Sequence, residues 1–294
     1  MTHTRRTLTV ATALLGLCLI NEAHAQIFVA TYYGNSIGEY TTAGASVNAS
    51  LISGLSGPYS VAVSDGYIFV GNGSGAIGKY TTAGATVNPS LFWVSLPTGL
   101  AVSGDNIFVV SDSDGTIGEY TTSGATVNAS LVSGLNGPYS IAVSGGYIFV
   151  GNGFSDTIGE YTTTGEEVDP SLISGVTASG IAVSDGHIFV ANYNLGTIGE
   201  YTTTGATVNA SLISGLNSPF GIAVSGDHIF VSSEFGGTIG EYTTAGATVN
   251  ASLVSGLNFP TGLAVVPEPC TEALLTVSMG GWLLWRWRSR HTLF

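Results

Sequence analysis

The chain is 294 residues long and strongly acidic, with 19 Asp and Glu against 6 Lys and Arg and a formal net charge of −13. The imbalance is concentrated between residues 26 and 266, where Lys79 is the one basic residue among 16 acidic ones. Nucleic acid is therefore a poor partner, because phosphate binding needs clustered Lys and Arg, whereas divalent cations or neutral sugars suit such a surface.

Residues 1–25 have the features of a secretory signal peptide. Arg5 and Arg6 supply the positive start, an apolar run follows, and Ala23 and Ala25 form a small-residue cleavage motif. We expect export and removal of this segment by signal peptidase, so it plays no part in the fold. The paired arginines leave two routes open, ordinary secretion and twin-arginine export.

Residues 26–266 consist of six copies of one unit. The tripeptide Ile-Phe-Val begins at Ile27, Ile68, Ile107, Ile148, Ile188 and Ile229. A second marker, Ile-Gly-Glu/Lys-Tyr, begins at Ile37, Ile77, Ile117, Ile158, Ile198 and Ile239. A period of about 40 residues indicates a propeller or a solenoid built from one supersecondary unit. Both cysteines, Cys18 and Cys270, lie outside this segment, so it contains neither a disulfide nor a thiol nucleophile.

Each unit reads as four short strands. In the second unit we expect them at residues 60–63, 67–70, 76–82 and 86–92, with Asp65-Gly66 as a hairpin turn. The segments are too short and too rich in glycine for helices, and no apolar period of 3.6 residues is present. The fold class predicted for residues 26–266 is therefore all-β.

The two ends of the repeated segment predict a closed ring. It begins inside a unit, at a second strand over residues 27–30, and ends with an unpartnered first strand over residues 262–265. Together these fragments complete a unit, whereas a linear solenoid needs capping repeats at both ends. We therefore expect a six-bladed β-propeller closed by its N- and C-terminal strands. We also expect small side chains on the first strands to let them crowd around the axis: Ala62, Ala101, Ala142, Ala182, Ala223 and Ala264.

The unit resembles that of NHL-type and related six-bladed propellers. Residues 188–192, Ile-Phe-Val-Ala-Asn, precede a polar loop and a strand ending in the aromatic Tyr201, which is the order found in that family. The resemblance spans the repeated segment and implies a fold, but it implies no activity.

Variation among the six units predicts a binding face. First-to-second and third-to-fourth connections are nearly constant, whereas the second-to-third connections and the links between units vary. In a four-stranded antiparallel blade the variable connections share one end. Aromatic rings beside polar groups suit sugars, although drift in tolerant loops gives the same pattern. The candidate ligand-binding residues are Tyr32, Tyr33, Asp112, Asp114, Phe154, Asp156, Tyr193, Asn194, Glu234 and Phe235.

Signals for an enzyme are weak, and we assign no catalytic residue, cofactor or metal. His187 and His228 occupy a position that is Tyr or Asn in other units, which favours a surface role. The run from Asp112 to Gly115 looks like the start of a calcium loop but lacks the remaining ligands. The alternative is a propeller-type hydrolase or lyase, similar in outline to lactonase-like or streptogramin-lyase-like groups. Such an enzyme needs a metal at the channel mouth, yet the variable loops contain no His.

Residues 267–294 combine a Pro-Glu-Pro box, an apolar stretch and a final cluster of arginines. The order of these features resembles the PEP-CTERM sorting tail, which implies processing by an exosortase-type enzyme and display at the cell surface or in the extracellular matrix. An ordinary single-pass anchor, with the apolar stretch as a short helix in the membrane, is the alternative. The sorting residues are Pro267, Glu268, Pro269, Arg286, Arg288 and Arg290.

The sequence as a whole therefore predicts an exported, non-enzymatic propeller at the cell surface or in the extracellular matrix. We expect it to act as a binding or scaffold module for a polysaccharide or a surface protein, and to contact the membrane through its tail.

Overall fold

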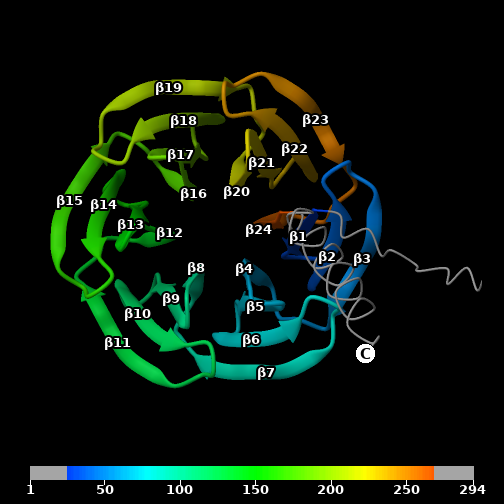
Figure 1. Ribbon diagram of the computed structural model, residues 1–294, viewed down its shortest axis with the longest axis horizontal. Coiled ribbons are helices and arrows are strands. Elements are labelled where there is room, and N and C mark those ends of the chain that lie inside the picture. The colour runs from blue at the N-terminus through cyan, green and yellow to red at the C-terminus, as the bar shows by residue number, and fades with distance from the viewer. Residues whose placement is uncertain (1–24, 268–294) are drawn as a thin grey trace, which may run out of the picture.

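The computed structural model describes residues 25–267, which form a ring of six four-stranded antiparallel sheets around a central axis (Figure 1). All 24 regular elements in this range are strands, which confirms the all-β, six-bladed prediction. Residues 1–24 of the predicted signal peptide, the sorting box from Glu268 onward and the short apolar helix expected in the tail lie outside the described residues, whereas Ala25 is described and its carbonyl accepts from Thr42 N–H at 3.2 Å. Within residues 25–267 no helix has the length and apolar character needed to cross a membrane.

The strands of each blade follow one another from the axis to the rim. Blade 1 contains β24 (Pro260–Val266), β1 (Gln26–Thr31), β2 (Ser36–Thr41) and β3 (Ser46–Ser53). Blade 2 contains β4 (Pro58–Ser64), β5 (Tyr67–Asn72), β6 (Ala76–Thr81) and β7 (Thr86–Trp93). Blade 3 contains β8 (Pro97–Ser103), β9 (Asn106–Ser111), β10 (Thr116–Thr121) and β11 (Thr126–Ser133).

The other three blades repeat the pattern. Blade 4 contains β12 (Pro138–Ser144), β13 (Tyr147–Asn152), β14 (Thr157–Thr162) and β15 (Glu167–Ser174). Blade 5 contains β16 (Ala178–Ser184), β17 (His187–Asn192), β18 (Thr197–Thr202) and β19 (Thr207–Ser214). Blade 6 contains β20 (Pro219–Ser225), β21 (His228–Ser233), β22 (Thr238–Thr243) and β23 (Thr248–Val254).

The ring closes through β1 and β24, which pair antiparallel with Phe28 opposite Ala264 and Val29 opposite Leu263. Figure 1 shows the last strand lying between the axis and the first strand. A fully buried hydroxyl on β24 strengthens this junction. Thr261 Oγ1 lies 2.9 Å from the carbonyl oxygen of Pro58 in blade 2 and 3.3 Å from that of Ala30 in blade 1. The closure predicted from the two chain fragments is confirmed.

The core lies between the blades, in six apolar clusters built from the repeated markers. Between blades 1 and 2, for example, Phe28 and Ile37 pack against Ile68 and Tyr80. The glycine of each Ile-Gly-Glu/Lys-Tyr marker has a steric cause, because a Cβ on Gly78 would lie 2.7 Å from the Tyr80 ring, which folds back over it. The marker is therefore a packing unit in which the glycine makes room for the tyrosine.

The first strands approach one another at a second position besides the predicted alanines. Ala62 packs in the cluster between blades 2 and 3. The close approach occurs two residues earlier, where a Cβ on Gly262 would lie 2.7 Å from the carbonyl oxygen of Tyr59 in the next blade. The first strand points an edge at the axis, so the side chains of the predicted alanines point into the blade interfaces, and their role in close approach stays a prediction.

Candidate binding site on the variable face

The two sets of variable connections lie together at one end of the ring, as the blade topology predicts. In all six blades a backbone N–H of the second-to-third connection donates to a carbonyl of the link that precedes the first strand of that blade. The pairs include Tyr32 with Phe259, Asp112 with Leu96, Tyr193 with Thr177 and Glu234 with Ser218. Gly73 makes the same kind of contact in blade 2. The variable loops are thus held as one layer by backbone hydrogen bonds.

A pocket of about 530 Å³ opens in this layer at the centre of the ring. Its volume is within the range of roughly 300–1,000 Å³ that is usual for small-molecule sites. Aromatic rings dominate the lining and come from blades 1, 2, 4, 5 and 6. These rings belong to Tyr32, Tyr33, Tyr59, Tyr139, Phe154, Tyr193, Phe220 and Phe259.

The floor of the pocket is built from one position of the first strand, at which the residue type alternates from each blade to the next. The second residue of the first strand is aromatic in blades 2, 4 and 6, and a small hydroxyl residue in blades 3, 5 and 1. In this order the residues are Tyr59, Tyr139 and Phe220, and Thr98, Ser179 and Thr261. The hydroxyl residues donate to first-strand carbonyls of the next blade, as Ser179 does to Pro219 at 2.7 Å. The small residues therefore join the blades, and the aromatic ones are free to fill the centre.

The three floor rings also separate the pocket from the axial channel, because they line both cavities. Tyr139 and Phe220 meet edge to face, with ring centroids 5.6 Å apart, although their blades are not adjacent. The channel below has a volume of about 120 Å³. A ligand that enters from the variable face would therefore rest on the three rings.

The wall nearest blade 1 is a second aromatic cluster. Tyr33 and Phe259 lie 4.7 Å apart between ring centroids, and Phe235 packs on Phe259 at 5.3 Å. Tyr32 packs against Tyr59 of blade 2 at 4.9 Å. Several of these rings are well exposed, with Tyr33 at 61% and Phe235 at 63% relative accessibility. Isolated exposed rings are unremarkable, but a contiguous set around a hollow marks a binding surface.

Two carboxylates face this aromatic environment. Glu234 is only 6% exposed, and the Tyr193 hydroxyl donates to its Oε2 at 2.8 Å. Burial raises the pKa of Glu234, and the hydrogen bond from Tyr193 partly opposes that rise. Burial also raises the pKa of Asp112. None of the residues that line the pocket is Lys, Arg or His, so neither carboxylate has a cationic partner there.

Burial keeps the tyrosine hydroxyls of the floor neutral. It raises the pKa of Tyr59 to about 12, with further contributions from the Tyr32 hydroxyl and the Glu234 carboxylate. Burial likewise raises the pKa of Tyr139, to which the neighbouring Tyr59 and Glu234 add. The floor therefore offers apolar ring faces and hydroxyl donors at neutral pH.

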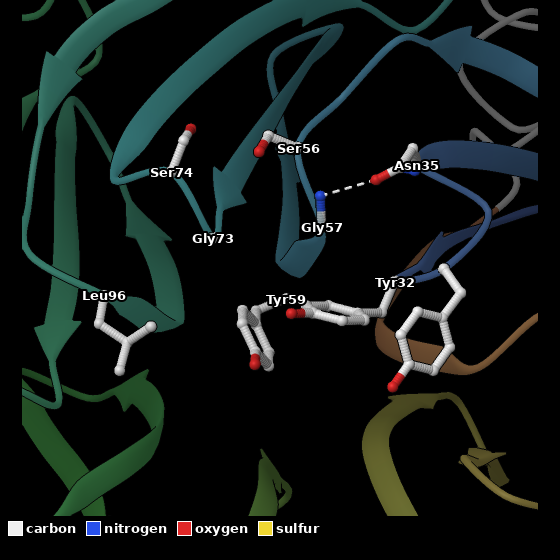
Figure 2. Close-up of a pocket in the computed structure, with 9 residues that line it drawn as sticks. Tyr32, Asn35, Ser56, Gly57, Tyr59, Gly73, Ser74 and Leu96 are labelled. Atoms are coloured by element: carbon white, nitrogen blue, oxygen red, sulfur yellow. Dashed lines mark hydrogen bonds between the residues drawn. The ribbon is translucent and has the colours of Figure 1, made fainter.

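A smaller hollow of about 450 Å³ adjoins the pocket (Figure 2). It shares Tyr32, Tyr33 and Tyr59 with the pocket, so these rings stand between the two. Its other side is open because the second-to-third connection of blade 2 carries only Gly73 and Ser74 where other blades carry larger side chains. The wall is fixed by Gly57 N–H, which donates to Asn35 Oδ1 at 2.9 Å. Two adjoining hollows suit an extended ligand.

Six of the ten residues predicted from the sequence line the central pocket. They are Tyr32, Tyr33, Asp112, Phe154, Tyr193 and Glu234. The other four, Asp114, Asp156, Asn194 and Phe235, are not among its lining residues. Asp114 accepts from Ser111 Oγ at 2.9 Å, and Thr177 Oγ1 donates to Asp156 at 2.7 Å and accepts from Asn194 at 3.0 Å.

Sequence reasoning missed four aromatic residues: Tyr59, Tyr139, Phe220 and Phe259. All lie in or next to the links between blades, which were recognised as variable but contributed no candidate. The signal that identifies three of them is the alternation of aromatic and hydroxyl residues over two units, which a unit-by-unit comparison hides.

The histidines lie away from this pocket. His187 Nδ1 is 2.8 Å from Glu200 Oε1, and His228 Nδ1 is 2.8 Å from Glu241 Oε1. Each histidine begins the second strand of its blade, directly after a constant turn. Among residues 25–267 no three side chains of the His, Cys, Asp and Glu types are grouped as a metal site would need.

Solved structures resemble this fold without close sequence similarity. One chain of a nidogen/laminin complex matches with a TM-score of 0.72 and 12% identity, over 84% of this chain and 100% of that one. A streptogramin B lyase matches with a TM-score of 0.60 and 19% identity, over 81% and 83% of the two chains. Virginiamycin B lyase from Staphylococcus aureus matches with a TM-score of 0.56 and 22% identity, over 70% and 73%.

These similarities support the propeller fold alone, since the identities are low and the matched proteins have different roles. No protein-family model and no curated protein matches the sequence of this chain.

Proposed function

We propose that this chain is a non-enzymatic binding module that is exported and displayed at the cell surface or in the extracellular matrix, and that its central pocket binds a polysaccharide. The observation that supports a sugar ligand is the set of eight aromatic rings around one pocket with two carboxylates among them. Ring faces pack against the C–H faces of a sugar, while carboxylates accept its hydroxyl protons. The adjoining hollow lengthens the site beyond a single sugar unit.

Export and display rest on the sequence features of the termini. The signal peptide leads to secretion, and the Pro-Glu-Pro tail is the proposed substrate of an exosortase-type enzyme, with membrane contact before cleavage. Mass spectrometry of the protein from its native host tests this proposal. A mature chain that starts at Gln26 and lacks the arginine cluster is expected, whereas recovery of an intact tail in the membrane would favour an ordinary anchor.

A glycan-binding measurement on pocket variants tests the ligand class. Removing the Tyr139 ring by Tyr139→Ala takes away part of the floor, so we expect binding to drop by tenfold or more, consistent with about 1.5–3 kcal/mol for burial of a large apolar side chain. Tyr147→Ala is the matched control, because Tyr147 is an exposed aromatic residue at a constant turn. Equal binding by the two variants on a glycan array would count against the pocket.

The alternative function, a propeller-type hydrolase or lyase, is similar in fold to the lyases described above. It requires a metal, and metal analysis of the purified protein distinguishes the two functions. A stoichiometric bound metal ion would favour the enzyme, whereas we expect none for the binding module.

A further inference from the structure

The central pocket contains a carboxylate that the described chain leaves without a positive partner. Glu234 lines the pocket and is only 6% exposed. Its carboxylate accepts one side-chain hydrogen bond, from the neutral Tyr193 hydroxyl. An ionised carboxylate that is buried in this way is unfavourable unless a cation or several donors compensate it. Folding alone gives no reason to keep a charge at this position.

No cation within the described range is available to compensate Glu234. Lys79 is the one Lys or Arg in residues 26–266, and its Nζ donates to the Thr122 carbonyl oxygen at 2.9 Å and lies 4.0 Å from the centroid of the Tyr67 ring. It is thus held between blades 2 and 3, at the constant turns. When the Glu234 carboxyl is ionised, a positive charge to match it can therefore come only from outside residues 26–266, and a ligand in the pocket is one source.

The walls of the pocket specify which kind of cation fits. Aromatic faces carry negative potential and attract ammonium groups that are within about 6 Å of the ring centroid. They cannot replace the oxygen ligands that Mg²⁺ or Ca²⁺ requires. A lining of eight aromatic rings with a carboxylate among them therefore complements an organic ammonium better than a metal ion. A volume of about 530 Å³ leaves room for the body that carries the ammonium.

We propose that the polysaccharide bound in this pocket contains amino sugars with free, protonated amino groups, and that the ammonium lies beside Glu234 while the sugar ring rests on Tyr59, Tyr139 and Phe220. This inference rests on the proposed polysaccharide function and names the chemical class of its ligand. Asp112 contributes a second negative charge to the same pocket. An N-acetylated sugar lacks the charge and gains no such interaction.

Calorimetric titration of the mature protein with two matched sugars tests the inference. The probes are a glucosamine trimer and its fully N-acetylated counterpart, in buffer just below neutral pH so that the amine is protonated. We expect the glucosamine trimer to bind about tenfold more tightly, which corresponds to about 1.4 kcal/mol from the ammonium. Glu234→Gln should abolish that preference, and Asp227→Asn, an exposed change at a constant turn, should leave it intact.

A second pair of probes separates the inference from the proposed function. Choline carries a permanent ammonium, and 3,3-dimethylbutan-1-ol is its neutral analogue of the same shape. If choline binds better than its analogue but neither trimer binds, the ammonium site stands and the polysaccharide function is wrong. Equal binding of the two trimers keeps the polysaccharide and overturns the ammonium. Failure of all four probes overturns both.

If Glu234→Gln fails to fold, a second variant still tests whether the ammonium is bound by the acidic side chains of the pocket. Asp112→Asn removes charge from the other side of the pocket, so it provides an independent reduction of the trimer preference. Circular dichroism of each variant confirms the β-sheet content before titration. Unchanged preference in folded Glu234→Gln and folded Asp112→Asn would contradict the inference.

Discussion

At the scale of single residues, the ionised Glu234 carboxylate lowers the stability of the fold but is needed to bind a cation. Because burial raises the pKa of its carboxyl, the folded protein holds the proton more tightly than the unfolded chain does. Stability therefore falls as the pH rises from the ordinary carboxyl range through the raised pKa, and the cost is fully present once the folded-state carboxyl is ionised. Binding of a cation has the opposite dependence, since it needs the ionised form. The groups that share the pocket with Glu234 are Asp112, Tyr59, Tyr139 and Tyr193, together with Tyr32 and Tyr33.

Glu234→Gln should thus stabilise the protein at neutral pH while it weakens the binding of an ammonium. The amide oxygen still accepts from Tyr193, and the desolvated charge is gone. If the relief is about 1 kcal/mol, the Tm measured by calorimetry rises by roughly 2–4 °C in a domain of this size. In acid the gain should vanish, because the wild-type carboxyl is already protonated.

The exposed Glu166 supplies the control, and Glu166→Gln should change the Tm little at either pH. A Glu234→Gln protein that is less stable than the wild type at neutral pH would show that the carboxylate is compensated after all.

Gly262 has no side chain, which lets the backbones of β24 and β4 pack closely where the ring closes. A Cβ at this position would meet the Tyr59 carbonyl oxygen at 2.7 Å and the Ser60 Cα at 2.8 Å, and both are backbone atoms that cannot move aside independently. We expect Gly262→Ala to destabilise the domain by roughly 2 kcal/mol or more, as other overpacking changes do. Gly153→Ala is the control, because its nearest neighbour would be at an ordinary 3.5 Å. Comparable urea midpoints for the two variants would refute a tight junction between β24 and β4.

At the scale of elements, the sequence predicts the strands well and the site only in part. The Ile-Phe-Val and Ile-Gly-Glu/Lys-Tyr markers locate the second and third strands of every blade, because both are buried and repeat without exception. The first strands were also found, but the close approach at Gly262 was not predicted. A repeat shows which positions are constant, and it does not show whether a constant side chain points at the axis or at a neighbouring blade.

The pocket floor was missed for a related reason. Tyr59, Tyr139 and Phe220 alternate with Thr98, Ser179 and Thr261, so the relevant period is two blades rather than one. The alternation has a physical basis, since six aromatic rings would overfill the centre, whereas three rings leave room for three hydroxyl contacts between blades. Ser179→Phe should therefore fill the pocket. We expect it to block the binding of a glucosamine trimer, measured by calorimetry, while the far-ultraviolet circular dichroism stays that of the wild type.

The Ser179→Phe variant blocks access to the pocket without changing its charge, because Ser179 lines the pocket and is uncharged. Retained binding in Ser179→Phe would place the ligand on another surface. The exposed loop residue Leu195 provides a control, because Leu195→Phe enlarges an apolar side chain that does not line the pocket.

At the scale of the whole molecule, the acidic charge and the central pocket act in the same direction. Sixteen carboxylates against one lysine in residues 26–266 give a negative field around the ring, which attracts a cationic ligand before contact. Added salt screens this field, with a Debye length of about 8 Å at physiological ionic strength. We expect the association rate of a glucosamine trimer to fall with added salt and that of the N-acetylated trimer to stay nearly constant. If the two association rates depended equally on salt, the negative field would not be what attracts the glucosamine trimer.

A crystal structure of the protein with a glucosamine trimer would show directly whether the aromatic pocket on the variable face is the binding site. We expect electron density for a sugar ring over Tyr59, Tyr139 and Phe220, with the sugar nitrogen within hydrogen-bond distance of the Glu234 carboxylate. Density for the trimer on the constant turns or along the outer strands, with the pocket empty, would contradict it.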